Sequence, residues 1–136
     1  MESTNDFVTW SDLRPALNTG LIQTLVSDVQ KPNVMQVQAA VVPLFLTNKD
    51  VCVKACTGSG KTLAFCVPLI QTLLNLVANE NNSYQKDEVL ALVVAPSREL
   101  AKQTSEIIQL FAAILPQLAF CYLIGGDKIE NDLSRI

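Results

Sequence analysis

The stretch Ala55-Cys56-Thr57-Gly58-Ser59-Gly60-Lys61-Thr62 decides the fold of this chain. It ends in the Gly-Lys-Thr of a phosphate-binding loop. It lies between an apolar run at 50–54, which predicts a buried strand, and a run at 62–76, which predicts a helix. This strand–loop–helix order is the context that the motif requires. The alternative is a simple Gly/Ser turn before an apolar helix, and the flanking pattern argues against it.

The residue types in this loop suit the binding of phosphate groups. Gly58 and Gly60 allow the backbone to turn so that its N–H groups face phosphate oxygens, and the helix that starts near Lys61 adds the positive end of its dipole. Lys61 is expected to reach the β- and γ-phosphates, and the Thr62 hydroxyl is expected to bind Mg²⁺. We therefore expect all residues from Ala55 to Thr62 to contact a nucleotide, with Lys61 and Thr62 as the catalytic residues.

Three further stretches carry a resemblance to a known family. They are Pro32-Asn33-Val34-Met35-Gln36, Pro96-Ser97-Arg98-Glu99-Leu100-Ala101 and Gly125-Gly126. In order and spacing they resemble the Q motif, motif Ia and the GG motif of the DEAD-box RNA helicases, and the loop with Ala55 at its first position resembles the form used by superfamily-2 helicases. The resemblance runs from about Trp10 to the last residue. It implies an α/β fold, namely part of a RecA-like P-loop domain whose parallel sheet has helices on both faces.

The same resemblance implies an activity and a set of ligands. The activity is RNA-stimulated ATP hydrolysis coupled to RNA strand separation or remodelling, with ATP and Mg²⁺ as cofactors. RNA is expected to contact motif Ia and the GG motif at Pro96, Ser97, Arg98, Glu99, Gly125 and Gly126. Beyond the loop, the nucleotide is expected to contact Gln36, Lys31 and Trp10.

The Q-motif residues also have a physical interpretation. The planar amide of Gln36 can donate and accept together, which suits the edge of adenine, although a lone Gln is by default a solvated helix residue. Trp10 stands where the family carries an isolated aromatic residue, and a core anchor is an equally good interpretation of it. The family also has Gly and then a stacking aromatic before the Q-motif proline. Here we expect those positions to hold Asp28 and Val29, which would forgo about 1 kcal/mol of base stacking.

Motif Ia follows a continuous apolar run at 89–95, as expected for a strand buried on both faces of a parallel sheet. Pro96 ends that run, and Ser97 and Arg98 open a helix at the sheet edge where ligands bind in open α/β folds. The Ser97 hydroxyl and the helix N-terminus suit a nucleic-acid phosphate, and Arg98 adds charge. A plain Ser N-cap followed by Glu99 is the alternative.

Two short stretches resemble one branch of the family, which assembles the large ribosomal subunit in the nucleolus. They are Val42-Pro43-Leu44-Phe45 and Asn48-Lys49-Asp50-Val51. This resemblance implies ribosome biogenesis as the pathway, pre-ribosomal proteins as partners, and the nucleus or nucleolus as the location, with the cytoplasm as the alternative.

Composition bounds the function further. The chain has 136 residues, the size of one domain, and a net charge of −3, so any RNA contact must be local. It has four cysteines and no histidine, which argues against a zinc site or a histidine-based triad. Cys52 and Cys121 are expected in the core, whereas Cys56 is either the most reactive thiol or a buried one.

The chain lacks a signal-peptide pattern, and the apolar run at 107–124 is better explained by a helix, a turn and a strand than by a membrane span. We therefore expect no membrane partner, no secretion and a reducing compartment.

The predicted elements alternate between helix and strand. Residues 1–9 form a polar tail, and 10–136 form the N-terminal part of a first RecA-like domain. Helices are expected at 21–29, 35–45, 62–78 and 98–115, with another beginning at 127; strands are expected at 50–54, 89–95 and 119–124; and 79–87 is expected to be a surface loop. Alternating elements of this kind predict a parallel sheet wound on both faces.

The sequence ends before the acidic pair that, in the family, follows the GG motif on the Walker B strand and binds Mg²⁺. The chain is therefore predicted to be truncated before that strand, to hydrolyse ATP at little above background, and to be marginally soluble alone. Two alternatives stay open. One is a truncated, non-enzymatic product that keeps nucleotide or partner contacts. The other is a different P-loop enzyme such as a GTPase, which Asn48-Lys49-Asp50 superficially suggests.

Overall fold

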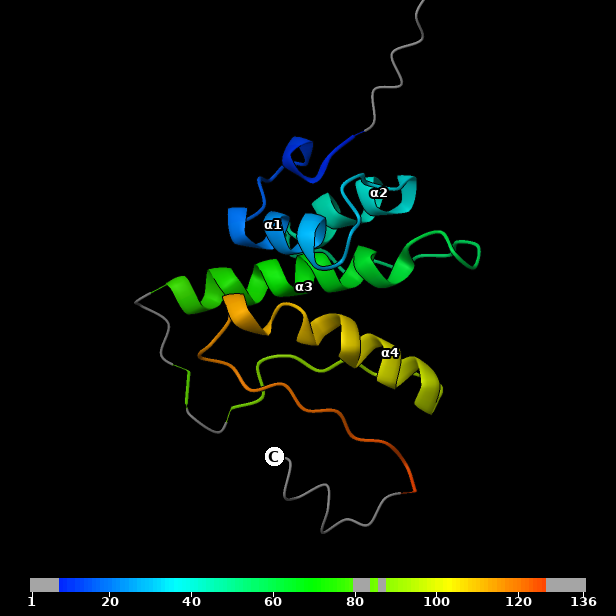
Figure 1. Ribbon diagram of the computed structural model, residues 1–136, viewed down its shortest axis with the longest axis vertical. Helices are drawn as coiled ribbons and strands as arrows, with labels where there is room; N and C mark the ends of the chain where they lie inside the picture. The colour runs from blue at the N-terminus through cyan, green and yellow to red at the C-terminus, as the bar shows by residue number, and fades with distance from the viewer. Residues whose placement is uncertain (1–7, 80–83, 86–87, 127–136) are drawn as a thin grey trace, which may run out of the picture.

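Helices dominate the fold, and one long helix lies at its centre. The computed structural model describes residues 8–79, 84–85 and 88–126. In chain order its elements are η1 (Trp10–Asp12), α1 (Thr19–Ser27), α2 (Gln36–Phe45), α3 (Lys61–Ala78), α4 (Arg98–Gln109) and η2 (Ala112–Ile114). Helices α1 and α2 lie on one side of α3, and α4 lies on the other (Figure 1). All four predicted helices within the described residues are therefore confirmed, although the fourth ends at Gln109 and is followed by a turn and η2.

The helix starts are set by local chemistry. The Asn18 side chain accepts hydrogen bonds from the N–H groups of Gly20 and Leu21 at the start of α1. The Ser97 hydroxyl accepts one from Leu100 N–H at 3.2 Å at the start of α4. Both satisfy backbone donors that the first helical turn leaves without a partner. Helix α3 instead begins directly after Gly60, whose φ of 89° is in the left-handed region.

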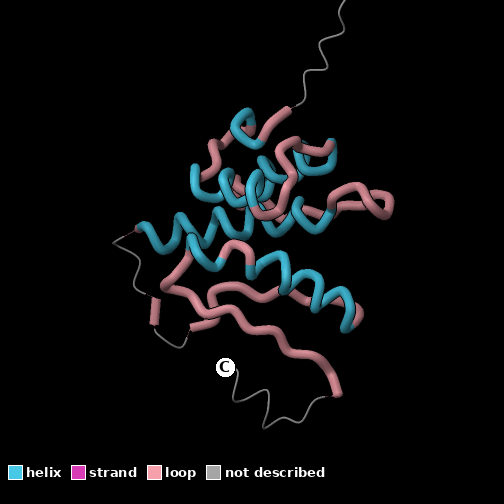
Figure 2. Tube along the Cα trace, viewed as in Figure 1, coloured by secondary structure: helices cyan, strands magenta, loops and turns pink. Residues whose placement is uncertain are grey.

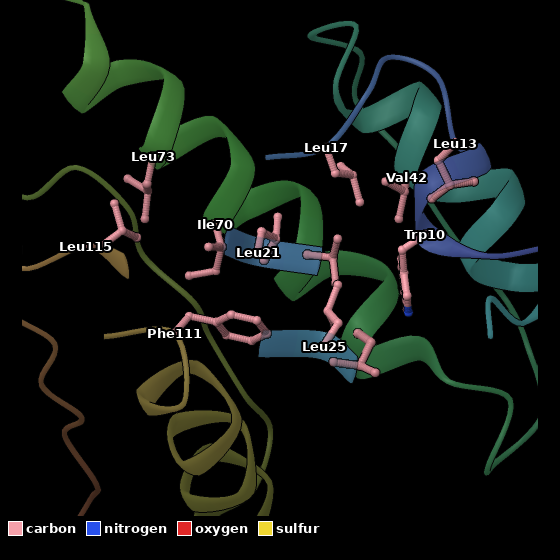
Figure 3. Close-up of a cluster of buried hydrophobic side chains, with 12 residues drawn as sticks. Trp10, Leu13, Leu17, Leu21, Leu25, Val42, Ile70, Leu73, Phe111 and Leu115 are labelled. Atoms are coloured by element: carbon pink, nitrogen blue, oxygen red, sulfur yellow. The ribbon is translucent and has the colours of Figure 1, made fainter. Parts of the chain in front are cut away.

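The hydrophobic core forms around one face of α3. Leu63, Val67, Ile70 and Leu73 recur at helical spacing on that face and are buried. Around them lie buried side chains from both flanking layers, and Figure 3 shows most of this cluster. These partners are Trp10, Leu13, Leu17, Leu21, Leu25, Val42, Phe111 and Leu115. The core therefore joins the N-terminal segment, α1, α2 and the segment that follows α4 through α3.

Among the described residues, α3 is the one helix long and apolar enough to cross a membrane, with a mean hydropathy of 1.5. Its apolar face is the centre of the core just described. The apolar run at 107–124 divides into the end of α4, η2 and an extended segment.

The N-terminal segment is tied to the loop that precedes α2. The Val34 N–H donates to the Val8 carbonyl at 2.8 Å, and Thr9 forms an isolated antiparallel bridge with Asn33. The indole N–H of Trp10 donates to the Lys31 carbonyl at 2.6 Å. Thr9 in turn donates from its hydroxyl and its backbone N–H to the Asp12 carboxylate, which lowers the pKa of Asp12. Residues 8–12 thus hold the loop at 28–35 against the body of the domain.

The predicted strands are not formed in the described part of the chain. Residues 50–54, 89–95 and 119–124 are extended but belong to no β-ladder, and Figure 2 shows them as loops. Val51 and Val53 line one cleft of about 370 Å³ together with Val93 and Val94, so the first two segments face each other across a gap. Strand pairing requires the two backbones to lie within hydrogen-bonding distance, and an apolar run predicts only the extended conformation.

Burial of these segments also differs from the prediction. Leu92 is 81% exposed and Val94 is 83% exposed, although the run at 89–95 was expected to be buried on both faces. Cys52 and Cys121 lie on the other two segments that form no β-ladder, and both are exposed. Their assignment to the core was therefore wrong. Most of the polar tail and the helix expected from 127 lie outside the described residues, as does part of the loop at 79–87.

Candidate functional site

The phosphate loop is a tight turn between an extended segment and the start of α3. Gly58 has a φ of 79° and Gly60 a φ of 89°, so both lie in the region that only glycine adopts without strain. The Ser59 N–H donates to the Cys56 carbonyl at 3.3 Å and closes the turn. The predicted loop-to-helix transition at Lys61 is therefore confirmed.

Lys61 folds back onto its own loop. Its Nζ donates to the Ala55 carbonyl at 2.8 Å and also to the Cys56 carbonyl. An ammonium group in that position sits inside the turn rather than in bulk solvent. The Lys61 ammonium is therefore positioned to contact an anion bound in the turn. In this structure its partners are the Ala55 and Cys56 carbonyls.

Ser59 indicates that the turn suits a ligand with acceptor atoms. Its hydroxyl is buried and has no hydrogen-bond partner among the described residues. A buried hydroxyl without a partner is unfavourable by about 1–3 kcal/mol, which a phosphate oxygen would relieve. Thr62, half-buried at the second position of α3, lines the cleft beside Lys61. Hydroxyl and ammonium donors around a turn with glycine conformations fit the triphosphate that the sequence predicts.

A glutamine contacts the loop, but it is Gln38 and not Gln36. Gln38 is only 2% exposed; its Oε1 accepts from the Met35 N–H at 2.8 Å and its Nε2 donates to the Gly60 carbonyl at 3.1 Å. Gln36 is exposed at the first turn of α2. Of the two glutamines, it is therefore Gln38 that the structure places against the phosphate loop. The signal in the sequence was present, because a second Gln stands on the same helix.

A second observation supports the same shift. Gln30 has a φ of 56°, a left-handed conformation that favours glycine. The expected Gly and aromatic pair was assigned to Asp28 and Val29, and moving it by two positions gives Gln30 and Lys31. In that register Gln30, whose backbone is left-handed, would stand at the glycine position and Lys31 at the position of the aromatic residue.

Trp10 is completely buried, with 0% of its surface exposed. It cannot stack on a bound base, so the alternative interpretation, a core anchor, describes it. Its indole holds the Lys31 carbonyl, and the Lys31 N–H donates to the Leu25 carbonyl at 2.9 Å. Lys31 is itself exposed. Trp10 is therefore a positioning residue for this loop.

Motif Ia and the GG motif meet in space. Gly126 has a φ of 99°, and a Cβ placed on it would lie 2.6 Å from Nη2 and 3.1 Å from Cζ of Arg98. The guanidinium of Arg98 therefore lies directly against the backbone of Gly126. Residues 96–99 and 125–126 are all exposed. The two motifs that were predicted to contact RNA thus share one surface, at the first turn of α4.

The cysteines divide into one buried and three exposed thiols. Cys66 is buried in α3, and burial raises the pKa of its thiol from 9.0 to about 12. Cys56, within the phosphate loop, is exposed. No group of three or more His, Cys, Asp or Glu residues among the described residues is arranged to hold a metal ion.

Solved structures define the class of this fold. A DEAD box protein from the hyperthermophile Methanococcus jannaschii superposes with a TM-score of 0.69 at 26% identity, over 95% of this chain and 32% of that one. The RNA-helicase Prp28 from Chaetomium thermophilum, solved with ADP, gives a TM-score of 0.66 at 31% identity, over 86% of this chain and 27% of that one. The fold is thus that of the RecA-like domain found in helicases of this class.

Sequence comparison identifies the family. The profile of the DEAD/DEAH box helicases matches residues 35–136. The ATP-dependent RNA helicase DDX55 of Xenopus laevis is 39% identical over 127 residues, or 93% of this chain and 20% of that protein. The ATP-dependent rRNA helicase SPB4 of Mycosarcoma maydis is 44% identical over 102 residues, or 75% of this chain and 13% of that protein. The chain belongs to the DEAD/DEAH box helicase family and spans about a fifth of the DDX55 sequences that it matches.

Proposed function

We propose that this chain is the nucleotide-binding part of an ATP-dependent RNA helicase. The observation that carries the proposal is the phosphate loop itself. Its two left-handed glycines, the inward ammonium of Lys61 and the orphaned hydroxyl of Ser59 surround one turn at the start of a helix. Membership of the helicase family supports the same function.

In this proposal the whole loop from Ala55 to Thr62 contacts ATP. The loop N–H groups and the N-terminus of α3 bind the phosphates. Lys61 exchanges its two carbonyl partners for phosphate oxygens, and the Thr62 hydroxyl ligates Mg²⁺, which neutralises charge on the phosphates when bound. Catalysis is assigned to Lys61 and Thr62, together with the acidic pair that the family carries on its Walker B strand.

Gln38 takes the role first assigned to Gln36. Its amide hydrogen-bonds both the Met35 N–H at the start of α2 and the Gly60 carbonyl, so it contacts the phosphate loop directly. Lys31, on the loop held by Trp10, remains a candidate contact for the base. Because the position otherwise taken by an aromatic holds a lysine, base stacking is expected to be weaker than in the family at large.

RNA binding is proposed for the joined surface of motif Ia and the GG motif. Its residues are Pro96, Ser97, Arg98, Glu99, Gly125 and Gly126. The Ser97 hydroxyl and the first N–H groups of α4 suit a phosphate of the RNA backbone, and the Arg98 guanidinium supplies the charge. A net charge of −3 means that this local arrangement, rather than a general basic surface, must provide the contacts.

The finer fold assignment belongs to the same proposal. Residues 10–136 would form the N-terminal part of a first RecA-like domain, with the segments at 50–54, 89–95 and 119–124 as strands of a parallel sheet. The cleft between the first two segments is compatible with further strands between them. For residues 10–136 we propose ATP binding, because rapid hydrolysis requires metal binding, water positioning and charge neutralisation to act together.

The proposed pathway is ribosome biogenesis. One matched relative, 44% identical to this chain, is named an rRNA helicase. We therefore propose rRNA as the substrate. Pre-ribosomal proteins as partners and a nucleolar location follow from the same proposal.

Nucleotide binding tests the central point. Isothermal titration of the chain with ATP and Mg²⁺ should give saturable binding, and Lys61→Ala should weaken it by about a hundredfold, as expected when a charge-assisted contact to phosphate is lost. GTP should bind less tightly than ATP. A preference for GTP would favour the alternative P-loop enzyme, and the absence of binding by the unmodified chain would contradict the proposal.

A further inference from the structure

Met35 lies over the phosphate loop. A Cβ placed on Gly60 would be 2.7 Å from the Met35 sulfur and 2.5 Å from Gln38 Nε2, both well inside van der Waals distance. The thioether and the amide thus occupy the side of Gly60 on which a side chain would project. Met35 and Gln38 together form the cover of the loop at the residue where α3 begins.

The Met35 residue is also accessible to solvent. The residue is 43% exposed, whereas the rest of this cover, Gln38, is buried. Met35 is one of two methionines in the chain, and the other is the first residue. A polarisable sulfur on an exposed residue that packs against a functional loop is the arrangement in which oxidation changes packing.

The backbone of Met35 belongs to the same set of contacts. Its N–H donates to Gln38 Oε1, and the same Gln38 amide donates to the Gly60 carbonyl. A movement of Met35 therefore affects Gly60 in two ways, through the Gln38 side chain and through the direct contact of the Met35 sulfur. Gly60 has a φ of 89° and no side chain, so the loop depends on these neighbours for lateral support.

We propose that Met35 is a site of reversible oxidation that weakens nucleotide binding by uncovering Gly60. A two-electron oxidant such as hydrogen peroxide transfers one oxygen atom to the sulfur; the O–O bond breaks, an S–O bond forms, and water leaves. The thioether is oxidised to a sulfoxide and the peroxide is reduced. Methionine sulfoxide is polar, so it turns toward solvent and leaves the apolar contact with the Gly60 backbone. The effect on affinity rests on the proposed nucleotide function.

The test uses the full chain, mild hydrogen peroxide, and a thiol reductant afterwards to restore the cysteines. Peptide mass spectrometry should find one added oxygen on Met35. ATP binding should weaken by about three- to tenfold, the range expected for loss of one packing contact. Treatment with methionine sulfoxide reductases, which do not act on cysteine, should restore it. Met35→Leu, which keeps an apolar side chain but cannot be oxidised, should bind ATP equally before and after peroxide.

Two further measurements keep the proposal testable without relying on affinity. Hydrogen exchange of the peptide covering residues 55–62 should become faster when Met35 is oxidised, in the absence of any nucleotide. Met35→Gln, which introduces a polar group of similar length, should exchange as fast without peroxide. If the unmodified chain does not bind ATP but exchange still responds to oxidation, the proposed function fails, whereas the oxidation-sensitive contact between Met35 and the loop stands.

Other outcomes overturn the inference. If Met35→Leu loses affinity as much as the unmodified chain does, the exposed Cys56 thiol in the loop is the oxidised group instead. If Met35 is fully oxidised and neither exchange nor affinity changes, the thioether contact does not support the loop.

Discussion

The Nε2 atom of Gln38 lies 3.1 Å from the carbonyl oxygen of Gly60, and this hydrogen bond joins α2 to the phosphate loop. The same amide accepts from the Met35 N–H, so both of its ends are used within a buried site. We expect Gln38→Ala to raise the Kd for ATP by about tenfold, because it removes both hydrogen bonds and leaves the Met35 N–H without this partner, while the Gly60 carbonyl keeps only its 3.1 Å bond from the Ala64 N–H. Isothermal titration with ATP and Mg²⁺ measures the change.

Gln36→Ala is the matched control for that variant. Gln36 lies on the same helix but is exposed. If it contacted the base as first expected, its truncation would weaken ATP binding more than that of Gln38. The structure leads us to expect the opposite order, and a larger effect at Gln36 would restore the original assignment.

Gly58 and Gly60 give a second matched pair. Both have positive φ, so alanine at either position introduces backbone strain of about 1 kcal/mol or more. A Cβ at Gly58 meets nothing within 4 Å, whereas one at Gly60 meets Gln38 and Met35. We therefore expect Gly60→Ala to lower the melting temperature and the ATP affinity more than Gly58→Ala does. Equal losses in differential scanning fluorimetry and titration would mean that strain alone sets the cost.

The sequence predicted the helices and the phosphate loop because both depend on local chemistry. Helical periodicity placed α3, the glycines placed the turn, and Ser97 placed the start of α4. The strands failed because pairing is non-local: the run at 89–95 has the composition of a buried strand, yet Leu92 and Val94 remain exposed and no ladder forms within the described residues. Composition cannot supply the neighbouring backbone that a strand needs.

The sequence alone did not single out the glutamine that contacts the phosphate loop. Proline and glutamine fixed the Q-motif position, and two glutamines on one helix gave two possible registers. Only burial distinguishes them, and burial depends on how α2 packs against the loop. The left-handed backbone of Gln30 was equally hidden, because a non-glycine residue gives no sign of positive φ in a sequence.

Trp10 should contribute to stability more than to chemistry. Trp10→Ala removes a completely buried aromatic side chain and should lower the free energy of unfolding by about 3–5 kcal/mol. Trp10→Phe keeps much of the apolar contact but removes the 2.6 Å hydrogen bond to the Lys31 carbonyl. It should cost about 1 kcal/mol, the usual net value of one hydrogen bond. Urea unfolding measures both, and a Phe variant as unstable as the Ala variant would mean that the hydrogen bond, not the packing, anchors the loop.

Cys66 should make the protein less stable at alkaline pH. Burial raises the pKa of its thiol from 9.0 to about 12, so the folded state holds this proton more tightly than the unfolded state does. The stabilisation is fully present below pH 9 and is lost as pH rises toward 12. The free energy of unfolding should fall more steeply above pH 9 in the unmodified chain than in Cys66→Ala. In native buffer, iodoacetamide should label the three exposed cysteines and spare Cys66; labelling of Cys66 at the same rate would contradict its burial.

Arg98 should carry much of the RNA affinity, because its guanidinium lies at the meeting point of motif Ia and the GG motif. Arg98→Ala is expected to weaken binding of single-stranded RNA and to reduce the slope of log K against log salt by about 0.7, the value for one phosphate contact on a single strand.

Lys102→Ala is the control for Arg98→Ala. Lys102 lies on the same helix, its substitution removes the same charge, and its ammonium forms an exposed 3.9 Å ion pair with Glu106. Gly126→Ala should behave like a weaker form of Arg98→Ala, because its Cβ would displace the guanidinium without removing it. Fluorescence anisotropy at several salt concentrations separates these cases: equal losses for Arg98→Ala and Lys102→Ala would mean that RNA senses only the net charge, whereas a loss confined to Arg98 and Gly126 would locate the contact at the first turn of α4.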